Sequence, residues 1–85
     1  MQDYSAFEAK LNDDHDWPCT YTFKCIVPSA EADTFRSALS EHTLTDRASK
    51  SGKYISFTLE FTAQSSNDVV AVYQTASTIP GAMPL

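Results

Sequence analysis

The stretch that decides the fold is Ser49-Lys50-Ser51-Gly52-Lys53-Tyr54-Ile55-Ser56-Phe57-Thr58-Leu59-Glu60-Phe61. In its second half, apolar side chains occupy every other position, and polar side chains lie between them. Because successive side chains of a strand point to opposite faces of a sheet, this alternation predicts a strand over 54–62 with one buried face. Before it, Ser51-Gly52-Lys53 is a polar turn in which Gly52 can adopt positive φ at little cost. Together they predict a β-hairpin whose second arm is a central strand.

A second stretch, 19–27, alternates in the same way and is followed by Pro28, which ends strands. It predicts another half-buried strand. The first arm of the hairpin, 45–50, is poor in apolar residues and therefore belongs at a sheet edge, where charges discourage association. The terminal segment 82–85 contains Pro84, which cannot donate to a strand ladder, so this segment is also expected at an edge.

Two further segments show the spacing of amphipathic helices. The first follows Ser29, a favourable N-cap, and predicts a helix over 30–42 that ends at His42, where a cation suits the helix dipole. The second predicts a helix over 67–78, ended by Pro80-Gly81. The apolar positions are Ala32, Phe35, Ala38 and Leu39 in the first helix, and Val69, Val72, Tyr73, Ala76 and Ile79 in the second.

The predicted order is strand, helix, strand, strand, helix, strand. Right-handed crossovers place both helices on one face of the sheet. The fold class is therefore α+β, a βαββαβ two-layer sandwich whose antiparallel sheet has the strand order 4-1-3-2. In this order the two alternating strands lie at the centre, and the polar and proline-containing strands lie at the edges.

Residues 1–16 stand apart from this predicted domain, which covers 17–85. They hold five acidic side chains against a single cation, Lys10. Tyr4, Phe7 and Leu11 recur at helical spacing, which predicts a short helix over 4–11 that docks through Tyr4 and Phe7. The run Asn12-Asp13-Asp14-His15-Asp16 predicts a solvated linker, because a local run lacks the separated, converging ligands of a metal site.

Several of these residues resemble a known family. Trp17-Pro18, Tyr21, Lys24, the run from Ser49 to Thr58, Tyr73 and Ile79-Pro80-Gly81 are similar to the pattern of the YbeD-like family of small uncharacterised bacterial proteins. The resemblance covers residues 17–85. It implies a ferredoxin-like fold related to ACT-type regulatory domains, with no established catalytic activity. The chain departs from the family pattern in a shorter first-helix segment, and it lacks the glycine that ACT-type domains place beside a bound amino acid.

Composition and motifs exclude several function classes. The 85 residues carry a net charge of −5, which argues against nucleic acid and anionic membranes as partners. No apolar run is long enough for a membrane span or a signal peptide. Cys19 and Cys25 lie too far apart in one predicted strand to bond to each other, so we expect inert, reduced thiols and a cytoplasmic location. No nucleophile has a histidine beside it, and Gly52-Lys53 leads into a strand, unlike a phosphate loop, so we expect no enzyme activity, cofactor or metal.

The candidate site is a basic patch in this acidic chain, made of Arg47, Lys50 and Lys53 with Tyr54 beside them. It could bind an acidic peptide, a carboxylate ligand or the acidic N-terminal segment of the chain itself. In the other interpretation, its charges only protect a sheet edge. A second candidate surface is the open face of the sheet, with Thr20, Thr22, Lys24, Ile26, Tyr54, Ser56, Thr58 and Glu60.

The leading hypothesis is a non-enzymatic regulatory or adaptor domain that binds another protein through the open sheet face or the 47–54 hairpin. One alternative is an ACT-like sensor of a small acidic metabolite, and another is a purely structural homodimer, expected to be weak. An RNA-binding sheet would show exposed aromatic side chains among basic residues, and a single tyrosine in a net-negative chain does not meet that requirement.

Overall fold

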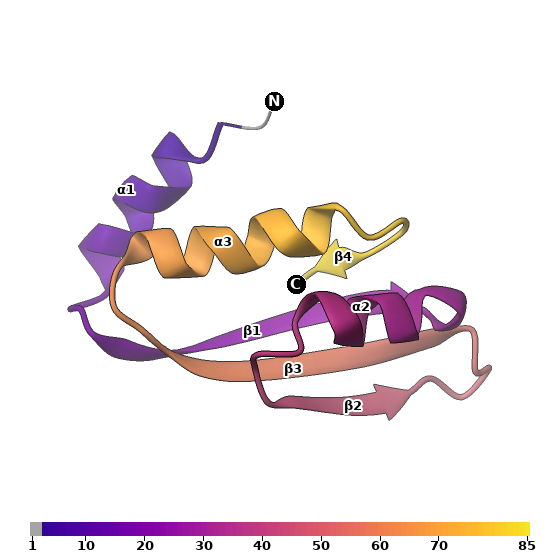
Figure 1. The fold of residues 1–85 in the computed structure, drawn as a ribbon. Helices are drawn as coiled ribbons and strands as arrows, with labels where there is room; N and C mark the ends of the chain where they lie inside the picture. Colours follow the sequence, from indigo (N-terminus) through magenta and orange to yellow (C-terminus); the bar gives the residue numbers. More distant parts are fainter. Residues whose placement is uncertain (1–2) are drawn as a thin grey trace.

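Four strands form one antiparallel sheet in the computed structural model, which describes residues 3–85 (Figure 1). They are β1 (Cys19–Pro28), β2 (Leu44–Ala48), β3 (Tyr54–Ala63) and β4 (Met83–Pro84). The order across the sheet is β2-β3-β1-β4, which reads 4-1-3-2 from the opposite edge. The two long strands therefore lie at the centre, and the two short strands lie at the edges.

The central pair places the predicted apolar side chains on one face. β1 and β3 are paired along their whole lengths, from Cys19 opposite Ala63 to Pro28 opposite Tyr54. Phe23 lies opposite Leu59 and Cys25 lies opposite Phe57, and all four side chains are buried. The alternation in the sequence thus predicted both central strands and the buried face of each.

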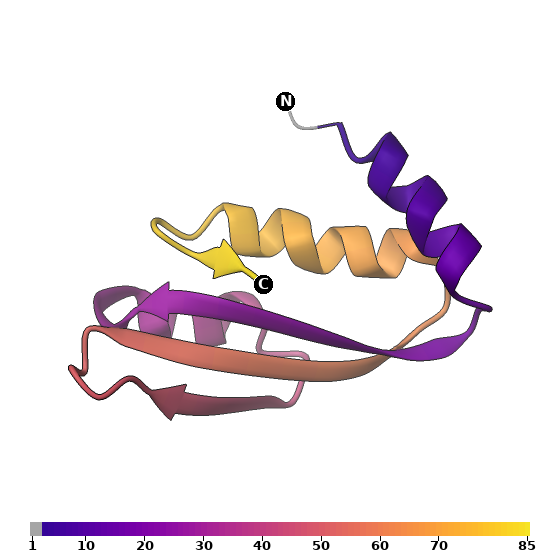
Figure 2. The same ribbon diagram turned by 180° about the vertical axis from the view of Figure 1, so that it is seen from behind.

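Two helices cover this apolar face. α2 (Ala32–Ala38) and α3 (Ser66–Ser77) lie on the same side of the sheet, and the opposite side has no helix over it in the part of the chain that the structure describes (Figures 1 and 2). The Phe35 ring of α2 stacks on the Phe57 ring of β3 with centroids 4.6 Å apart, and Val72 and Ala76 of α3 complete the core. This α+β architecture is compatible with a ferredoxin-like fold.

The first helix is shorter than predicted. In place of a helix over 30–42, the chain forms a 3-10 turn, η1 (Ser29–Glu31), and then α2, which ends at Ala38. Leu39 is buried as expected, but Ala38 is exposed and His42 lies in a turn, so its predicted role at a helix end is wrong. A helix that continued to residue 42 would leave one residue to reach β2, whereas such connections usually need about 2–6.

Ser29 does not cap a helix, which corrects a second prediction. Neither η1 nor α2 has a side-chain cap, and Ser29 instead binds the hairpin turn. Its amide donates to the Lys53 carbonyl at 2.9 Å, and its hydroxyl donates to the Gly52 carbonyl. The junction between β1 and η1 is thereby fastened to the turn between β2 and β3.

The bounds of two other elements also differ from the predictions. β2 covers 44–48 and not 45–50, because the apolar Leu44 packs against the core and the chain turns after Ala48. The last helix begins and ends one residue earlier than the predicted 67–78. Both elements keep their predicted positions, with β2 at the edge of the sheet and α3 over its apolar face.

A third helix, α1 (Ser5–Asp14), packs against α3 at the end of the sheet where β1 begins (Figure 2). Docking through Tyr4 and Phe7 is confirmed, since both pack against a cluster that contains the buried Leu11, and the Phe7 ring lies 4.8 Å from that of Tyr73. The helix is longer than the predicted 4–11, so residues 12–14 are helical and do not form a linker. Leu11 is the buried residue of this helix and packs with Ala63 of β3 and with Val69 and Val70 of α3.

We predict that Leu11→Ala lowers the free energy of unfolding by about 2–5 kcal/mol, the usual cost of removing a buried leucine side chain. Leu11 is 4% exposed and packs with Ala63, Val69 and Val70. The matched control is Lys10→Ala, which changes an exposed neighbour on the same helix and should cost less than about 0.5 kcal/mol. Urea unfolding measures both values, and equal effects would mean that α1 does not pack on the core.

A second prediction compares two glycines. Gly52 and Gly81 both have positive φ, 73° and 74°, but a Cβ at Gly52 would meet open space, whereas one at Gly81 would lie 2.7 Å from Pro28 Cγ. Gly52→Ala should therefore cost only the left-handed backbone penalty of about 1–2 kcal/mol. Gly81→Ala should cost about 1–3 kcal/mol more, because the added methyl group overpacks the site. Equal losses in urea unfolding would contradict the close approach of Gly81 and Pro28.

Candidate functional site

The hairpin turn is held in place by its serines. The Ser49 amide donates to the Tyr54 carbonyl at 2.9 Å, and the Gly52 amide donates to the Ser49 carbonyl at 3.0 Å. The Tyr54 amide donates to Ser49 Oγ, and the Lys53 amide donates to Ser51 Oγ, both at 3.3 Å. Ser29 bonds to the Gly52 and Lys53 carbonyls of the same turn, so hydrogen bonds restrain the turn backbone from both sides. The serines and the glycine of this motif thus have structural roles that the lysine side chains do not share.

One row of side chains crosses the uncovered face of the sheet beside this turn. Arg47 of β2 lies opposite Ser56 of β3, Ser56 lies opposite Ile26 of β1, and Ile26 lies opposite Met83 of β4. Residues directly opposite each other project from the same face of a sheet. The row therefore brings a cation, a hydroxyl and two apolar side chains together from all four strands.

A groove of about 490 Å³ lies along this row. Lys50 and Tyr54 also line it, together with the backbone of the turn. Tyr54 is 43% exposed and Met83 is 50% exposed. The only other exposed large apolar side chain among residues 3–85 is that of Leu85, which follows β4 and whose amide donates to the Lys24 carbonyl. The exposed large apolar side chains of the described chain therefore gather on the uncovered face, beside β1 and β4.

Free positive charge gathers on the same face. The chain has six cations, and two of them are neutralised by ion pairs: Lys10 lies 3.8 Å from Asp14, and Arg36 lies 2.9 Å from Asp46 and 3.0 Å from Asp33. The other four make no ion pair within residues 3–85 and lie on the open sheet face or the hairpin turn; they are Lys24, Arg47, Lys50 and Lys53. In a chain of net charge −5, this is a local reversal of charge.

Three of the four predicted site residues meet at the groove: Arg47, Lys50 and Tyr54. Lys53 is exposed at the end of the turn but does not line the groove. Sequence reasoning missed Met83, because its pairing with Ile26 joins residues that are far apart in the chain. The idea that the acidic N-terminal segment of the chain covers its own basic patch is wrong, since α1 packs on α3 at the opposite end of the sheet (Figure 1).

A family model of a protein of unknown function, DUF493, matches residues 12–83. The chain belongs to this family, which is the YbeD family of small uncharacterised bacterial proteins. No curated protein and no solved structure gave a significant match. The match includes the hairpin turn, β4 as far as Met83, and the last three residues of α1.

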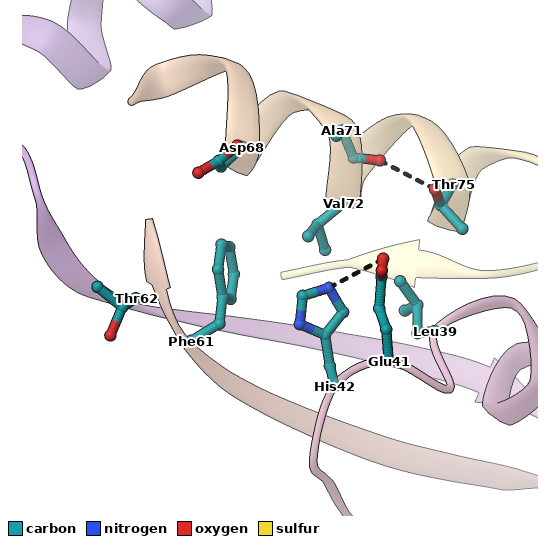
Figure 3. Close-up of a pocket in the computed structure, with 9 residues that line it drawn as sticks. All are labelled: Leu39, Glu41, His42, Phe61, Thr62, Asp68, Ala71, Val72 and Thr75. Atoms are coloured by element: carbon teal, nitrogen blue, oxygen red, sulfur yellow. Dashed lines mark hydrogen bonds and ion pairs between the residues drawn. The ribbon is translucent and has the colours of Figure 1, made fainter. Parts of the chain in front are cut away.

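In this YbeD-family chain, a second pocket of about 410 Å³ lies between α3 and the turn after α2 (Figure 3). The pocket lies beyond the end of α2 at Ala38, so α2 does not cover Phe61. The Phe61 side chain is half-buried and lines the pocket. His42 packs on Phe61 with ring centroids 5.3 Å apart, and its Nε2 lies 3.5 Å from Glu41 Oε1. A histidine, His42, and two carboxylates, those of Glu41 and Asp68, thus line a common pocket.

The polar groups of this second pocket have structural partners. Asp68 Oδ2 accepts the Gln64 amide at 2.8 Å, at the start of α3. The Thr75 hydroxyl donates to the Ala71 carbonyl at 3.0 Å within the same helix (Figure 3). The Asp68 carboxylate and the Thr75 hydroxyl therefore bond within α3 and its start, and the partner of His42 in this pocket is the Glu41 carboxylate.

The two thiols of this family member differ in their surroundings. Cys25 is fully buried in the core, and burial raises its pKa from 9.0 to about 11. Cys19 is half-buried at the start of β1. Burial also raises the pKa of Tyr73, with a further contribution from the Tyr21 hydroxyl 3.3 Å away. Both shifts follow from packing in the core. Tyr73 also lines a third pocket, of about 540 Å³, whereas Cys25 does not.

Among residues 3–85, no group of three His, Cys, Asp or Glu side chains is arranged to bind a metal ion. His15, which the sequence places in an acidic run, instead packs its ring against Trp17 and Tyr21, at 5.5 and 5.6 Å between centroids. Within the same residues, no helix is both long and apolar enough to cross a bilayer.

We predict that alkylation at pH 8 modifies Cys19 well before Cys25. The higher pKa of Cys25 leaves a thiolate fraction about a hundredfold smaller than that of an ordinary cysteine, and its burial blocks the reagent. Mass spectrometry of peptides after timed iodoacetamide treatment measures both rates. In the Cys19→Ser variant, any alkylation that remains occurs at Cys25. In urea the two rates should become similar; equal rates in the folded chain would contradict the buried position of Cys25.

Proposed function

We propose that this chain is a small regulatory or adaptor domain, without catalytic activity of its own, that binds another protein through the hairpin end of its uncovered sheet face. The observation that carries the proposal is the coincidence of two features at one place. The exposed large apolar side chains of residues 3–85 and all their unpaired cations lie on this face or in the adjoining turn.

The chemistry of this surface suits a protein partner. Aromatic residues, Met and Arg are enriched at protein interfaces, and Tyr54, Met83 and Arg47 supply one of each around the groove. Ile26 lies half-buried between them and extends the apolar area. An apolar centre with a charged rim is the usual anatomy of such interfaces, because the centre supplies affinity and the charges supply orientation.

The fold supports a regulatory role less directly. The βαββαβ order and the helices on one face support a ferredoxin-like assignment, and the ACT-like resemblance connects it to domains that regulate other proteins. Because one fold hosts many functions, the surface of the domain is the stronger support for this role. The proposal places the domain in the cytoplasm, where free thiols such as Cys19 and Cys25 stay reduced.

A second candidate function is favoured by the groove itself. Its volume of about 490 Å³ is within the range of about 300–1,000 Å³ found for small-molecule sites, and Arg47 and Lys50 could bind a carboxylate. An ACT-like sensor of a small acidic metabolite would use these groups. The groove is, however, a shallow feature of a sheet face, which fits a protein surface better than a ligand that must be enclosed.

The test is site-specific photocrosslinking in the native cell with p-benzoylphenylalanine at position 54. Replacing the exposed Tyr54 by another aromatic residue leaves the backbone bonds of the turn intact. The matched control carries the crosslinker at Gln74, an exposed position on α3. We expect a discrete heterologous adduct from position 54 and none from position 74, and we expect Arg47→Glu/Lys50→Glu/Lys53→Glu to abolish it, whereas Lys10→Glu should not.

Three outcomes would contradict the proposal. Equal labelling from positions 54 and 74, or none from either, would mean that the face binds no specific protein. An adduct that contains only this chain, with a concentration-dependent mass in sedimentation, would favour the structural homodimer. A rise in Tm with small dicarboxylates that requires Arg47 and Lys50, in the absence of any protein adduct, would favour the sensor.

A further inference from the structure

β2 has a free edge. It pairs with β3 on one side only, because it is the last strand of the sheet. A strand in this position presents unpaired N–H and C=O groups on its outer side, which can accept another extended segment. The strand at the other edge, β4, is only two residues long and contains Pro84, which has no N–H. It therefore offers few backbone groups to an added strand.

The hydrogen bonds fix which residues of β2 face outward. In an antiparallel pair, opposite residues alternate between bonded and non-bonded. The Ser49 amide donates to the Tyr54 carbonyl, so Arg47 and Thr45 are the next residues that bond to β3. The amides and carbonyls of the alternate residues of β2 point away from the sheet; these residues are Leu44, Asp46 and Ala48.

The side chains around this edge are not neutral. Arg47 projects from the uncovered face, Lys50 follows in the turn, and both line the groove beside the strand. On the opposite side of β2, the Asp46 carboxylate is already paired with Arg36 at 2.9 Å. An added strand would therefore meet free positive charge on the uncovered face and an apolar hollow next to it.

We propose that β2 accepts an extended acidic segment of a partner protein as a fifth strand of the sheet. The backbone of the segment bonds to Leu44, Asp46 and Ala48, its carboxylates meet Arg47 and Lys50, and one apolar side chain enters the groove beside Tyr54. This inference rests on the proposed function and adds to it the binding mode and the chemistry of the partner.

Two central pairings of β2 with a second copy of itself oppose like charges. A two-fold antiparallel pairing of β2 with itself, centred on Asp46, would set that residue opposite its own copy. The pairing centred one residue later would set Arg47 opposite Arg47. Like charges directly opposite each other destabilise paired strands, so both registers are unfavourable. An acidic segment has the complementary charge in either strand direction.

The experiment selects a phage-displayed library of random twelve-residue peptides against the full chain, with Arg47→Glu/Lys50→Glu as the counter-selected decoy. We expect enrichment of peptides that combine Asp or Glu with at least one large apolar residue. An enriched peptide should bind at least tenfold more weakly to the decoy than to the wild type, and its affinity should fall with added salt. Lys10→Glu is the charge-matched control and should bind normally.

The binding mode has its own readout, which needs no variant. In the free protein, amide hydrogen exchange should be slow at Thr45 and Arg47 and fast at Leu44, Asp46 and Ala48. Saturation with the selected peptide should slow exchange at these last three amides at least tenfold. Ala48→Pro removes one outward N–H and leaves the bonds to β3 in place, so it should weaken peptide binding while the fold persists.

The outcomes separate this inference from the proposed function. No enrichment, enrichment of basic peptides, or unchanged exchange at the three outward amides would overturn the fifth-strand proposal. If position 54 still crosslinks to a partner in the cell, the proposed function stands and the partner binds the sheet face in another way. Slowed exchange at the outward amides together with selection of acidic peptides would support both.

Discussion

The pairing of β1 with β3 is the interaction on which the rest of this structure depends. It runs without a bulge from Cys19 opposite Ala63 to Pro28 opposite Tyr54. Because side chains alternate along a strand, a slip of one residue would exchange the buried and solvated faces of both strands. The correct register places Phe57 under Phe35 of α2 and leaves Ser56 and Ile26 on the uncovered side. Core and candidate surface are therefore two consequences of one register.

Much of this arrangement could be predicted from local patterns in the sequence. Alternation identified both central strands and their buried faces, and helical spacing identified α3 and the docking residues of α1. The positions of the edge strands followed from polarity and from Pro84. Arg47, Lys50 and Tyr54, three residues of the candidate site, were selected because a cluster of positive charge beside an aromatic side chain is unusual in an acidic chain, and all three line one groove. These features depend on near neighbours in the chain, which a sequence displays directly.

The remaining features depend on contacts between distant residues. No residue in 39–43 breaks a helix, so the sequence does not mark the end of α2. The helix ends at Ala38 because the chain needs the following residues to connect to β2, which begins at Leu44. Ser29 has the chemistry of an N-cap, but the hairpin turn lies within reach and offers carbonyls that need donors. Met83 joins the site only through its pairing with Ile26. In each case tertiary structure decides between options that are locally similar.

The bonds from Ser29 to Gly52 and Lys53 have a consequence for recognition. A free loop at this position would lose conformational entropy when a partner ordered it, and that loss would weaken binding. Here the turn is already tied to the β1–η1 junction, and its own serines restrain it further. Lys50 therefore lies on a pre-organised backbone, and a partner that bound here would not have to order the turn.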